Sequence, residues 1–467
     1  MNNWLFREGT QLSVVQRATH TYVIGQPGMG KSRALESWIM QDILAGRGVG
    51  VIDPHGDLYR HLVFRLAILL QSRPELAERV ILIDPTDPVW TVGFNPLQAG
   101  NGMYKERLAW LLTDVIIKIW RLDTATAPRM LRLLTFSFLA LSEFQLTLLD
   151  LPRFLLDEAW RKSLLSRTRH PEITDYFNLE FPKGASAVHQ WAMPVLNKIG
   201  PLIFDPEMRL MLATESTINF RKILDRNQVL LVNLPKGILG EGNSALLGAF
   251  IVAHLQQAAL SRANSWERNP FFLYLDEFQN YTTDNIKDIL SESRKYALSL
   301  VMAHQYLAQL AEDLRGAVLN TAGTIVCFRI GYHDANELCR DLFIPGSLKA
   351  THHELNFAHL AGYPMPYFQE RTEPLDREAL ASLLTQLRPR EFWMKQRGPY
   401  SPVKQRALDV PDPKLSRELF QARKDLVNAS ASHYGKLKSE IRKQVDARRA
   451  NGSANSKYTT EYYEPTQ

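Results

Sequence analysis

The stretch TYVIGQPGMGKS, residues 21–32, decides the fold of this chain of 467 residues. A short apolar run precedes a glycine-rich turn, and a helical pattern follows the turn. The turn matches G-x-x-x-x-G-K-[ST], the spacing of a phosphate-binding loop that lies between a strand and a helix. The stretch therefore predicts a nucleotide site at the start of an α/β domain.

Each residue type in this loop suits a phosphate. Glycines let the backbone wrap around the anion without side-chain clashes, and the free amides and helix N-terminus supply positive potential. We expect Lys31 to reach the β- and γ-phosphates of ATP and Ser32 to offer an oxygen to Mg²⁺. The residues expected to bind ATP are Gly25, Gln26, Pro27, Gly28, Met29, Gly30, Lys31, Ser32 and Arg33.

The second half of such a site is an apolar strand that ends in acidic residues. FFLYLDEF, residues 271–278, has this form. We expect Asp276 to hold Mg²⁺ through its water shell and Glu277 to take a proton from the attacking water. An Asp-Glu pair alone is more often a strand-end turn, so the interpretation depends on the loop. The guanine-reading motif N-K-x-D is absent, which disfavours a GTPase.

Two further candidates follow the acid pair. Gln305 ends the apolar run LSLVMAHQ, and ligands gather at the carboxyl ends of parallel strands. We expect Gln305 to sense loss of the γ-phosphate, although a capping or exposed glutamine is the simpler alternative. Arg294, in SESRKYALSL, is a candidate arginine finger for a neighbouring subunit. Lys295 is a close rival, Arg329 is a second candidate, and a solvated cation at a helix end is the alternative.

One more acidic residue lies at a predicted strand end. Asp53, in VIDPHGDL, is expected to orient water or Mg²⁺ from outside the first coordination shell. Asp57, in the same segment, is expected to cap the next helix.

Short apolar, β-branched runs alternate with helical patterns along most of the chain. The strands are expected at 21–24, 48–52, 79–83, 229–233, 271–275, 298–303 and 324–328. Helical patterns at 32–44 and 57–70 follow the first two. This alternation predicts an α/β fold with a mostly parallel central sheet that is covered on both faces.

The pattern also predicts four parts. Residues 1–102 and 226–412 form the two halves of the ATPase core, and residues 103–225 form an all-α insertion domain. Residues 413–467 form a polar tail that is partly helical or disordered. In it, the segment NASASHYG separates two short amphipathic patterns, and the end, NGSANSKYTTEYYEPTQ, has a disordered composition; the apolar positions of the patterns are Leu415, Leu419 and Leu426, then Leu437, Ile441 and Val445. The net charge is +6, but residues 414–467 hold eleven Lys/Arg and six Asp/Glu, so the remainder is nearly neutral. The basic tail has three candidate partners, DNA, anionic lipid and a partner helix, and simple solvation is the alternative.

Composition indicates an intracellular protein. Two cysteines, Cys327 and Cys339, cannot build a disulfide framework. No run of about 18 apolar residues is present, so we expect no transmembrane anchor. We expect a cytoplasmic location or peripheral attachment at the inner face of the membrane.

The order of motifs carries a specific resemblance. GQPGMGKS, GVGVIDPHGDL, VILIDPTDPVWTVGFNPL, a helical stretch, VLLVNLPKGILGEGNSALLGAF, FFLYLDEFQNY, LSESRKYALSLVMAHQYLAQL and NTAGTIVCFRIGYHDANEL follow one another. This series resembles the coupling-protein and conjugative-ATPase branch of the HerA/FtsK superfamily, with TraG/TraD-like coupling proteins of type IV secretion, over roughly residues 15–400.

The resemblance implies a RecA-like core that forms a hexameric ring around single- or double-stranded DNA. It implies ATP and Mg²⁺ at the subunit boundaries, with residues 25–32 binding ATP and Asp276 with Glu277 activating water. It further implies that Gln305 couples hydrolysis to movement and that Arg294 completes the neighbour's site. A relaxase and secretion-channel proteins are the implied partners.

Two other functions compete with conjugative transfer. A HerA-like DNA motor in repair, packaging or defence would share the chemistry, and neighbouring genes would separate the two. A nucleotide-gated adaptor would recruit protein substrates through the helical insertion and do little work on DNA. Stimulation of ATP hydrolysis by DNA would distinguish a motor from an adaptor.

Overall fold

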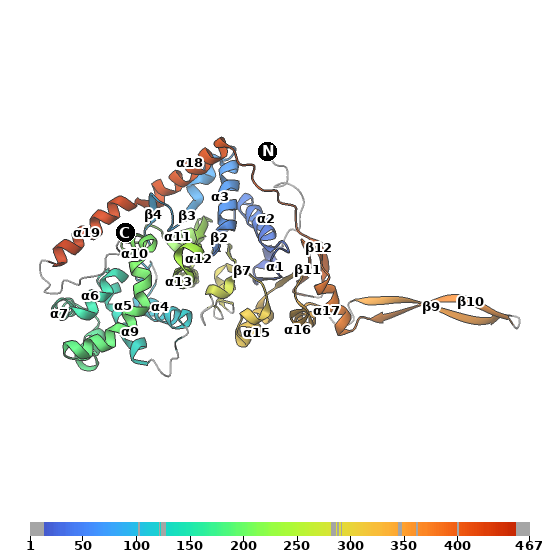
Figure 1. The fold of residues 1–467 in the computed structure, drawn as a ribbon, viewed down its shortest axis with the longest axis horizontal. Helices are drawn as coiled ribbons and strands as arrows, with labels where there is room; N and C mark the ends of the chain where they lie inside the picture. Colours follow the sequence, from blue (N-terminus) through green and yellow to red (C-terminus); the bar gives the residue numbers. More distant parts are fainter. Residues whose placement is uncertain are drawn as a thin grey trace, which may run out of the picture. The chain divides into compact units, whose positions relative to one another are not determined.

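The computed structural model describes residues 14–453, except for 101–102, 121, 123–127, 282–285, 287–288, 291, 344–347, 361–362 and 399–400. It is an α/β structure with a nine-stranded, mostly parallel central sheet (Figure 1). The strand order is β12-β11-β8-β1-β7-β6-β2-β5-β3. Its strands are β1 (Thr21–Ile24), β2 (Gly48–Asp53), β3 (Val80–Ile83), β5 (Val229–Asn233), β6 (Phe271–Leu275), β7 (Leu298–His304), β8 (Thr324–Cys327), β11 (Glu391–Gln396) and β12 (Val403–Arg406).

Burial explains why the seven strands from β1 to β8 in this sheet form. Every residue in them is buried, as in a parallel sheet covered on both faces. β1 pairs in parallel with β7 and with β8, and β5 pairs in parallel with β2 and with β3. The expected fold class and all seven expected strands are confirmed. β11 and β12 were not predicted, and they add an antiparallel edge beyond β8.

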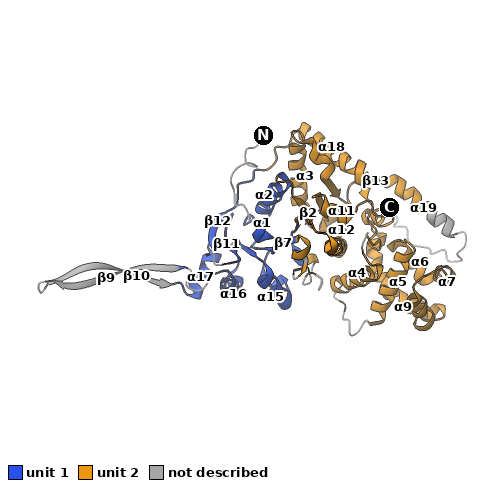
Figure 2. Cartoon of the chain, turned by 180° about the vertical axis from the view of Figure 1, so that it is seen from behind, with its two compact units in different colours: residues 1–44, 274–279, 299–411 blue, residues 45–273, 280–298, 412–467 orange. Residues whose placement is uncertain are grey.

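The chain divides into two compact units, which Figure 2 shows in different colours. Unit 1 comprises residues 1–44, 274–279 and 299–411. Its strands β9 (Lys349–Leu360) and β10 (Tyr363–Pro374) form a separate antiparallel pair that was not predicted. Its helices are α1 (Val14–Arg17), α2 (Lys31–Leu44), α15 (Glu312–Thr321), α16 (Tyr332–Leu342) and α17 (Arg377–Thr385).

A buried ion pair joins three elements of unit 1. Arg17 of α1 and Asp42 of α2 lie 2.6 Å apart, and their side chains are 3% and 0% exposed. The Tyr274 hydroxyl, at the end of β6, donates a hydrogen bond to the same carboxylate at 2.6 Å. A buried charge needs both a counter-ion and hydrogen bonds. This pair therefore fixes α1 and α2 against the strand that leads to the acid pair.

Unit 2 comprises residues 45–273, 280–298 and 412–467. Between residues 105 and 225, the described part of the chain contains helices and no strands, and α5 packs on both α4 and α9 (Figure 1). The helices before the tail are α3 (Asp57–Leu70), α4 (Lys105–Ile119), α5 (Pro128–Glu143), α6 (Leu151–Leu156), α7 (Glu158–Leu165), α8 (Pro171–Asp175), α9 (Ala185–Phe204), α10 (Pro206–Leu212), α11 (Phe220–Asp225), α12 (Lys236–Leu239) and α13 (Glu241–Leu260).

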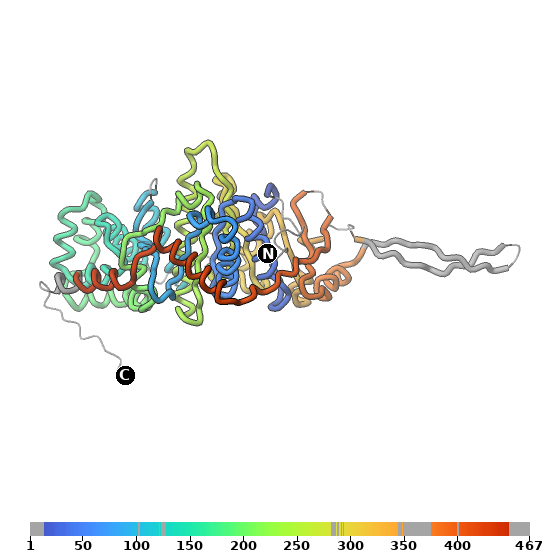
Figure 3. Tube along the Cα trace, turned by 90° about the horizontal axis from the view of Figure 1, so that it is seen from above, coloured from blue at the N-terminus to red at the C-terminus, as the bar shows by residue number. Residues whose placement is uncertain are grey.

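The C-terminal segment is folded onto unit 2 up to residue 453. It forms α18 (Arg417–Tyr434), β13 (Gly435–Leu437) and α19 (Lys438–Ser453), and β13 pairs with β4 (Trp90–Val92). Figure 3 shows α18 running beside α3. The Ser430 hydroxyl of α18 accepts a 3.0 Å hydrogen bond from the Leu82 amide of β3.

The second tail helix, α19, covers α10. Ile441 and Val445 of α19 form one apolar cluster with Leu210 and Ala213. Lys438 adds an ion pair with Glu207 at 3.1 Å. The two amphipathic patterns expected in the tail are thus packed helices, and the expectation of disorder at the end concerns residues 454–467, outside the described residues.

One helix meets the length and composition of a membrane span. Among the described residues, the segment Glu241–Asn264, which begins with α13, passes this test by itself, and α5 with the segment Leu148–Leu156 passes only as a pair bent by 118°. The apolar window of the single helix is 78% buried inside the protein. That burial is typical of a core helix.

Candidate nucleotide-binding site

The loop between β1 and α2 has the backbone of an anion cradle. Gly28 and Gly30 adopt positive φ values of 75° and 100°, a region that glycine enters without cost. α2 begins at Lys31 and has no acidic residue in its first turn. The positive end of the helix is therefore available to an anion at this loop.

Lys31 is buried at the centre of this loop. Its ammonium group donates hydrogen bonds to the carbonyl oxygens of Gly25 and Gln26, the second at 3.2 Å. Burial lowers the pKa of Lys31, and the charges of Asp276 and Glu277 oppose that effect. Lys31 is thus within electrostatic reach of the acid pair, although about 250 residues separate them in the sequence.

The other loop residues divide between surface and interior. Pro27 and Ser32 are exposed, whereas Met29 is 8% exposed. The Arg33 guanidinium forms an ion pair with Glu36 at 2.9 Å. Ser32 is thus accessible for metal binding, and the Arg33 side chain interacts with its own helix.

Two segments from late in the chain form a wall of the loop. The Gln26 amide donates to the Arg329 carbonyl at 2.8 Å, and the Arg390 amide donates to the Met29 carbonyl at 2.8 Å. A methyl group on Gly30 would lie 3.2 Å from Cγ of Arg390. The Arg390 guanidinium pairs with Asp409 at 2.6 Å. The structure therefore places the predicted candidate Arg329 beside the loop and adds Arg390, which no sequence signal indicated.

The acid pair follows β6 directly and is nearly buried. Asp276 is 7% exposed and Glu277 is 6% exposed. Glu277 has a φ of 49°, a left-handed conformation that is unfavourable for residues other than glycine. Such conformations cluster at functional sites, where the surrounding structure maintains them. Here the Glu277 amide donates a 3.1 Å hydrogen bond to the Asp276 carboxylate.

Two glutamines hold the Glu277 carboxylate. Nε2 of Gln305 donates to Oε1 at 2.7 Å, and Nε2 of Gln279 donates to Oε2 at 2.7 Å. The backbone amide of Gln305 donates in turn to Oε1 of Gln309 at 2.9 Å. The structure thus brings together the predicted residues Glu277 and Gln305. Gln279 and Gln309 were missed, because their spacing matched no motif.

A buried histidine completes the surroundings of the acid pair. His304 is the last residue of β7, and its Nε2 lies 2.6 Å from the Tyr22 hydroxyl of β1. Burial lowers the pKa of His304 to about 4, so the ring is neutral near pH 7. Phe278 packs edge-on against this ring, with the centroids 5.2 Å apart.

The remaining candidates, Asp53 and Arg294, belong to unit 2. The Asp53 carboxylate accepts hydrogen bonds from the backbone amides of His55 at 2.8 Å and Tyr59 at 2.9 Å, so it holds the turn before α3. Its proposed effect on water or Mg²⁺ stays a prediction. The expectation that Asp57 caps α3 is wrong, because Gly56 occupies the cap and Asp57 pairs with Arg60 at the surface.

Arg294 lies in the short 3-10 helix η7 (Ser293–Tyr296), and its side chain is exposed. An exposed cation is what an arginine finger requires, and the role itself stays a prediction.

The residues of unit 1 fit a nucleoside triphosphate with Mg²⁺. Ser32 and Asp276 offer the oxygen ligands that Mg²⁺ prefers, and Mg²⁺ commonly takes its other ligands from phosphate and water. Within the described residues, no group of three His, Cys, Asp or Glu side chains could hold a metal without such help. The positive φ values of Gly28 and Gly30 provide the backbone for the phosphates.

Comparison with known proteins gives matches among solved structures only. No protein-family model matches the chain, and no curated protein matches it. The unbound form of the bacterial conjugative coupling protein TrwB, without its first 70 residues, matches with a TM-score of 0.57 and 13% identity. The match covers 88% of this chain and 92% of that one.

Two nucleotide complexes of the same protein match equally well. TrwB with ADP and Mg²⁺, and TrwB with a non-hydrolysable ATP analogue, each match with a TM-score of 0.57, 14% identity and the same coverage. At this identity the likeness concerns the fold. The chain therefore has the RecA-like P-loop fold of the conjugative coupling protein TrwB.

Proposed function

We propose that this chain is an ATP-hydrolysing motor that works as a ring of subunits and moves DNA in conjugative transfer. The observation that carries the proposal is the hydrogen bond from Gln305 to Glu277, in the same unit as the P-loop lysine. A glutamate held by polar donors beside a phosphate-binding loop supports hydrolysis by activated water rather than storage of a nucleotide.

Each residue of the site has a defined part in this chemistry. When bound, MgATP supplies the phosphoryl group that water attacks. Lys31 places a buried positive charge at the cradle, Ser32 would offer an oxygen to Mg²⁺, and Asp276 would hold the ion through its water shell. Glu277 takes the proton from the attacking water at a carboxylate oxygen. Gln305 and Gln279 each use one acceptor site of that carboxylate, and an ionised carboxylate keeps further sites for water.

Gln305 also links chemistry to movement in this proposal. It lies one residue after β7, whose neighbour β1 leads into the phosphate loop. A change in hydrogen bonding at Glu277 is therefore transmitted to the end of β7. DNA as the moved substrate rests on the TrwB fold, and the ring rests on Arg294 acting in a neighbouring subunit. A relaxase and secretion-channel proteins are the proposed partners, and the cytoplasm is the proposed location.

The test is ATP hydrolysis with and without DNA, together with particle size by electron microscopy. We expect single- or double-stranded DNA to raise the rate and ring particles to form with nucleotide. Lys31→Ala should abolish turnover, and Glu277→Gln should bind ATP but hydrolyse it roughly 10²–10⁴-fold more slowly. Arg60→Ala, at an exposed ion pair, is the matched control. Normal turnover in Lys31→Ala refutes the site, and hydrolysis that DNA does not alter favours a nucleotide-gated adaptor.

A further inference from the structure

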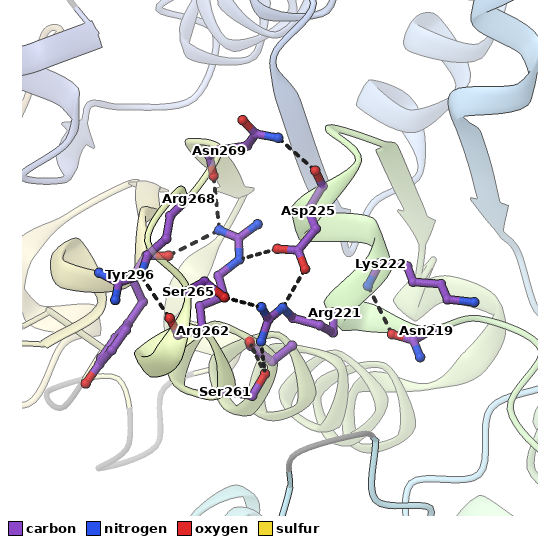
Figure 4. A network of polar contacts seen from close by, with 11 residues as sticks. Asn219, Arg221, Lys222, Asp225, Ser261, Arg262, Ser265, Arg268, Asn269 and Tyr296 are labelled. Carbon is purple, nitrogen blue, oxygen red and sulfur yellow. Dashed lines mark hydrogen bonds and ion pairs between the residues drawn. The ribbon is translucent and has the colours of Figure 1, made fainter.

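Arg268 joins two segments of unit 2 through backbone carbonyl groups (Figure 4). Its Nε and Nη2 donate to the carbonyls of Arg262 and Ala263 at 2.9 Å each, in the 3-10 helix η5 (Ser261–Asn264). Its Nη1 donates to the Lys295 carbonyl of η7 at 2.6 Å. The guanidinium also lies 5.5 Å from the centre of the Tyr296 ring. One planar fork therefore holds η7 at a fixed position beside η5.

A second arginine supports η7 from inside. Arg262 is fully buried and pairs with Asp225 at 2.9 Å. Its Nη1 donates to the carbonyls of Asn269 and Tyr296 at 3.0 and 3.1 Å. Arg221 binds the other oxygen of Asp225 at 2.6 Å, on the side of the network away from η7 (Figure 4). Arg262 and Arg268 thus contact η7, whereas the hydrogen bonds of Arg221 go to Asp225, Ser261 and Ser265.

The backbone of η7 also bears two exposed cationic side chains. Arg294 and Lys295 of η7 are both exposed. The Arg294 carbonyl accepts from the Ala297 amide at 3.1 Å, and Ala297 has a φ of 57°. The Ala297 carbonyl accepts from the Phe271 amide at the start of β6, at 2.9 Å. The backbone of the turn is therefore fixed at several points, whereas its cationic side chains point to solvent.

We propose that Arg268 is a positioning residue that sets the backbone from which Arg294 reaches the triphosphate held by a second copy of this chain. This inference rests on the proposed function, because it assumes that a cation of one subunit completes the site of the next. A catalytic group on a fixed backbone loses less entropy when it engages, and a misplacement of about 1 Å costs on the order of 10²-fold in rate. Arg268 acts through position, since each of its three guanidinium nitrogens donates to a carbonyl group of its own unit.

The experiment compares Arg268→Ala, Arg268→Lys and the matched control Arg221→Ala in the full chain. We expect Arg268→Ala to lower kcat for ATP roughly 10²-fold, while KM stays within about twofold, because the P-loop of the same subunit is untouched. Arg268→Lys keeps the charge but not the fork, so it should recover part of the rate. Arg221→Ala should keep the wild-type rate.

Two further measurements separate positioning from loss of folding. The double variant Arg268→Ala/Arg294→Ala should be no slower than Arg294→Ala, because residues that act through one another are not additive. Subunits with Arg268→Ala should regain activity when mixed with Glu277→Gln subunits. Additive losses, an equal loss in Arg221→Ala, or wild-type kcat in Arg268→Ala would overturn the inference. Full activity in both Arg294→Ala and Lys295→Ala would instead show that neither cation of η7 completes the site of a neighbouring subunit. That result would overturn this part of the proposed function and, with it, the inference.

Discussion

The Gln305 side chain lies 2.7 Å from the Glu277 carboxylate, with the amide nitrogen donating to Oε1. The pair connects the residues that follow two strands of the central sheet, β6 and β7. Glu277 is nearly buried and in a left-handed backbone conformation, so its carboxylate has little freedom once Gln305 and Gln279 hold it.

Gln305→Ala should therefore slow hydrolysis more than it weakens nucleotide binding. Without the Gln305 donor, the carboxylate of Glu277 loses a hydrogen bond that orients it, and we expect kcat to fall about 10- to 100-fold with little change in the affinity for ATP. Steady-state hydrolysis and equilibrium nucleotide binding measure the two effects. Gln386→Ala, at an exposed glutamine, is the control. An unchanged kcat would show that Gln305 is only an end cap for β7.

Arg294 is expected to act on a neighbouring subunit, which mixing can reveal. Arg294→Ala subunits keep their own P-loop and Glu277, and Glu277→Gln subunits keep an intact arginine. A mixed ring then contains some boundaries with both functional groups, so partial activity should return. The measurement is the ATPase rate as a function of mixing ratio. If mixing restores no activity although rings form, Arg294 does not complete a neighbour's site.

The buried pair of Arg17 and Asp42 should be costly to break from one side. Arg17→Met leaves the Asp42 carboxylate buried without its counter-ion, and such changes cost about 3–5 kcal/mol. Replacing the whole group, as Arg17→Met with Asp42→Leu and Tyr274→Phe, should recover much of that loss, because no buried polar group is then left without its partner. Urea unfolding of the three proteins checks this. A loss below about 0.5 kcal/mol in Arg17→Met would mean that the pair is locally replaceable by water.

We expect the buried His254 ring to make the folded protein less stable in acid. Its ring is buried between Phe94 and Phe220, its Nε2 lies 2.8 Å from the Pro96 carbonyl, and burial lowers its pKa from 6.5 to about 4. As the pH falls, His254 takes up its proton in the unfolded chain before it does so in the folded protein. The stability that comes from a neutral, buried His254 is therefore fully present above about pH 6.5 and is lost as the pH falls towards 4.

We expect His254→Gln to remove about 2 kcal/mol of the difference in unfolding free energy between pH 7.5 and pH 5. Urea unfolding at the two pH values measures that difference. The exposed His333→Gln should leave it as in the wild type. An unchanged pH dependence in His254→Gln would contradict the shifted pKa.

The sequence was most informative where burial and spacing coincide. β1 and β5 have the predicted bounds because they are short, wholly buried and bounded by turn residues. β11 was missed because its EFWMKQ pattern is only partly buried and contains charges, although the strand pairs with β12 on one side and β8 on the other. The segment NASASHYG looked like a break between helices, yet α18 continues to Tyr434, because Ser430 is buried against β3.

The site shows a similar division. Lys31, Asp276 and Glu277 could be predicted because phosphate and water chemistry requires those residue types at the ends of buried strands. The contact between Glu277 and Gln305 depends on the φ of Glu277, which no spacing encodes. Arg390 reaches the loop from a turn some 360 residues later, with a positive φ of its own. Such a contact follows from the pairing of β8 with β11 and leaves no motif.

The position of β1 between β7 and β8 has a consequence for synthesis on the ribosome. The Leu300 amide of β7 donates to Nδ1 of His20, just before β1, across 280 residues of sequence. At about 5–20 residues per second, that distance corresponds to roughly 15–60 s of translation. During this time the emerging β1 has neither of its two neighbours, and an unpaired apolar strand invites association with other chains. The phosphate loop thus leaves the ribosome long before the strands that complete its environment.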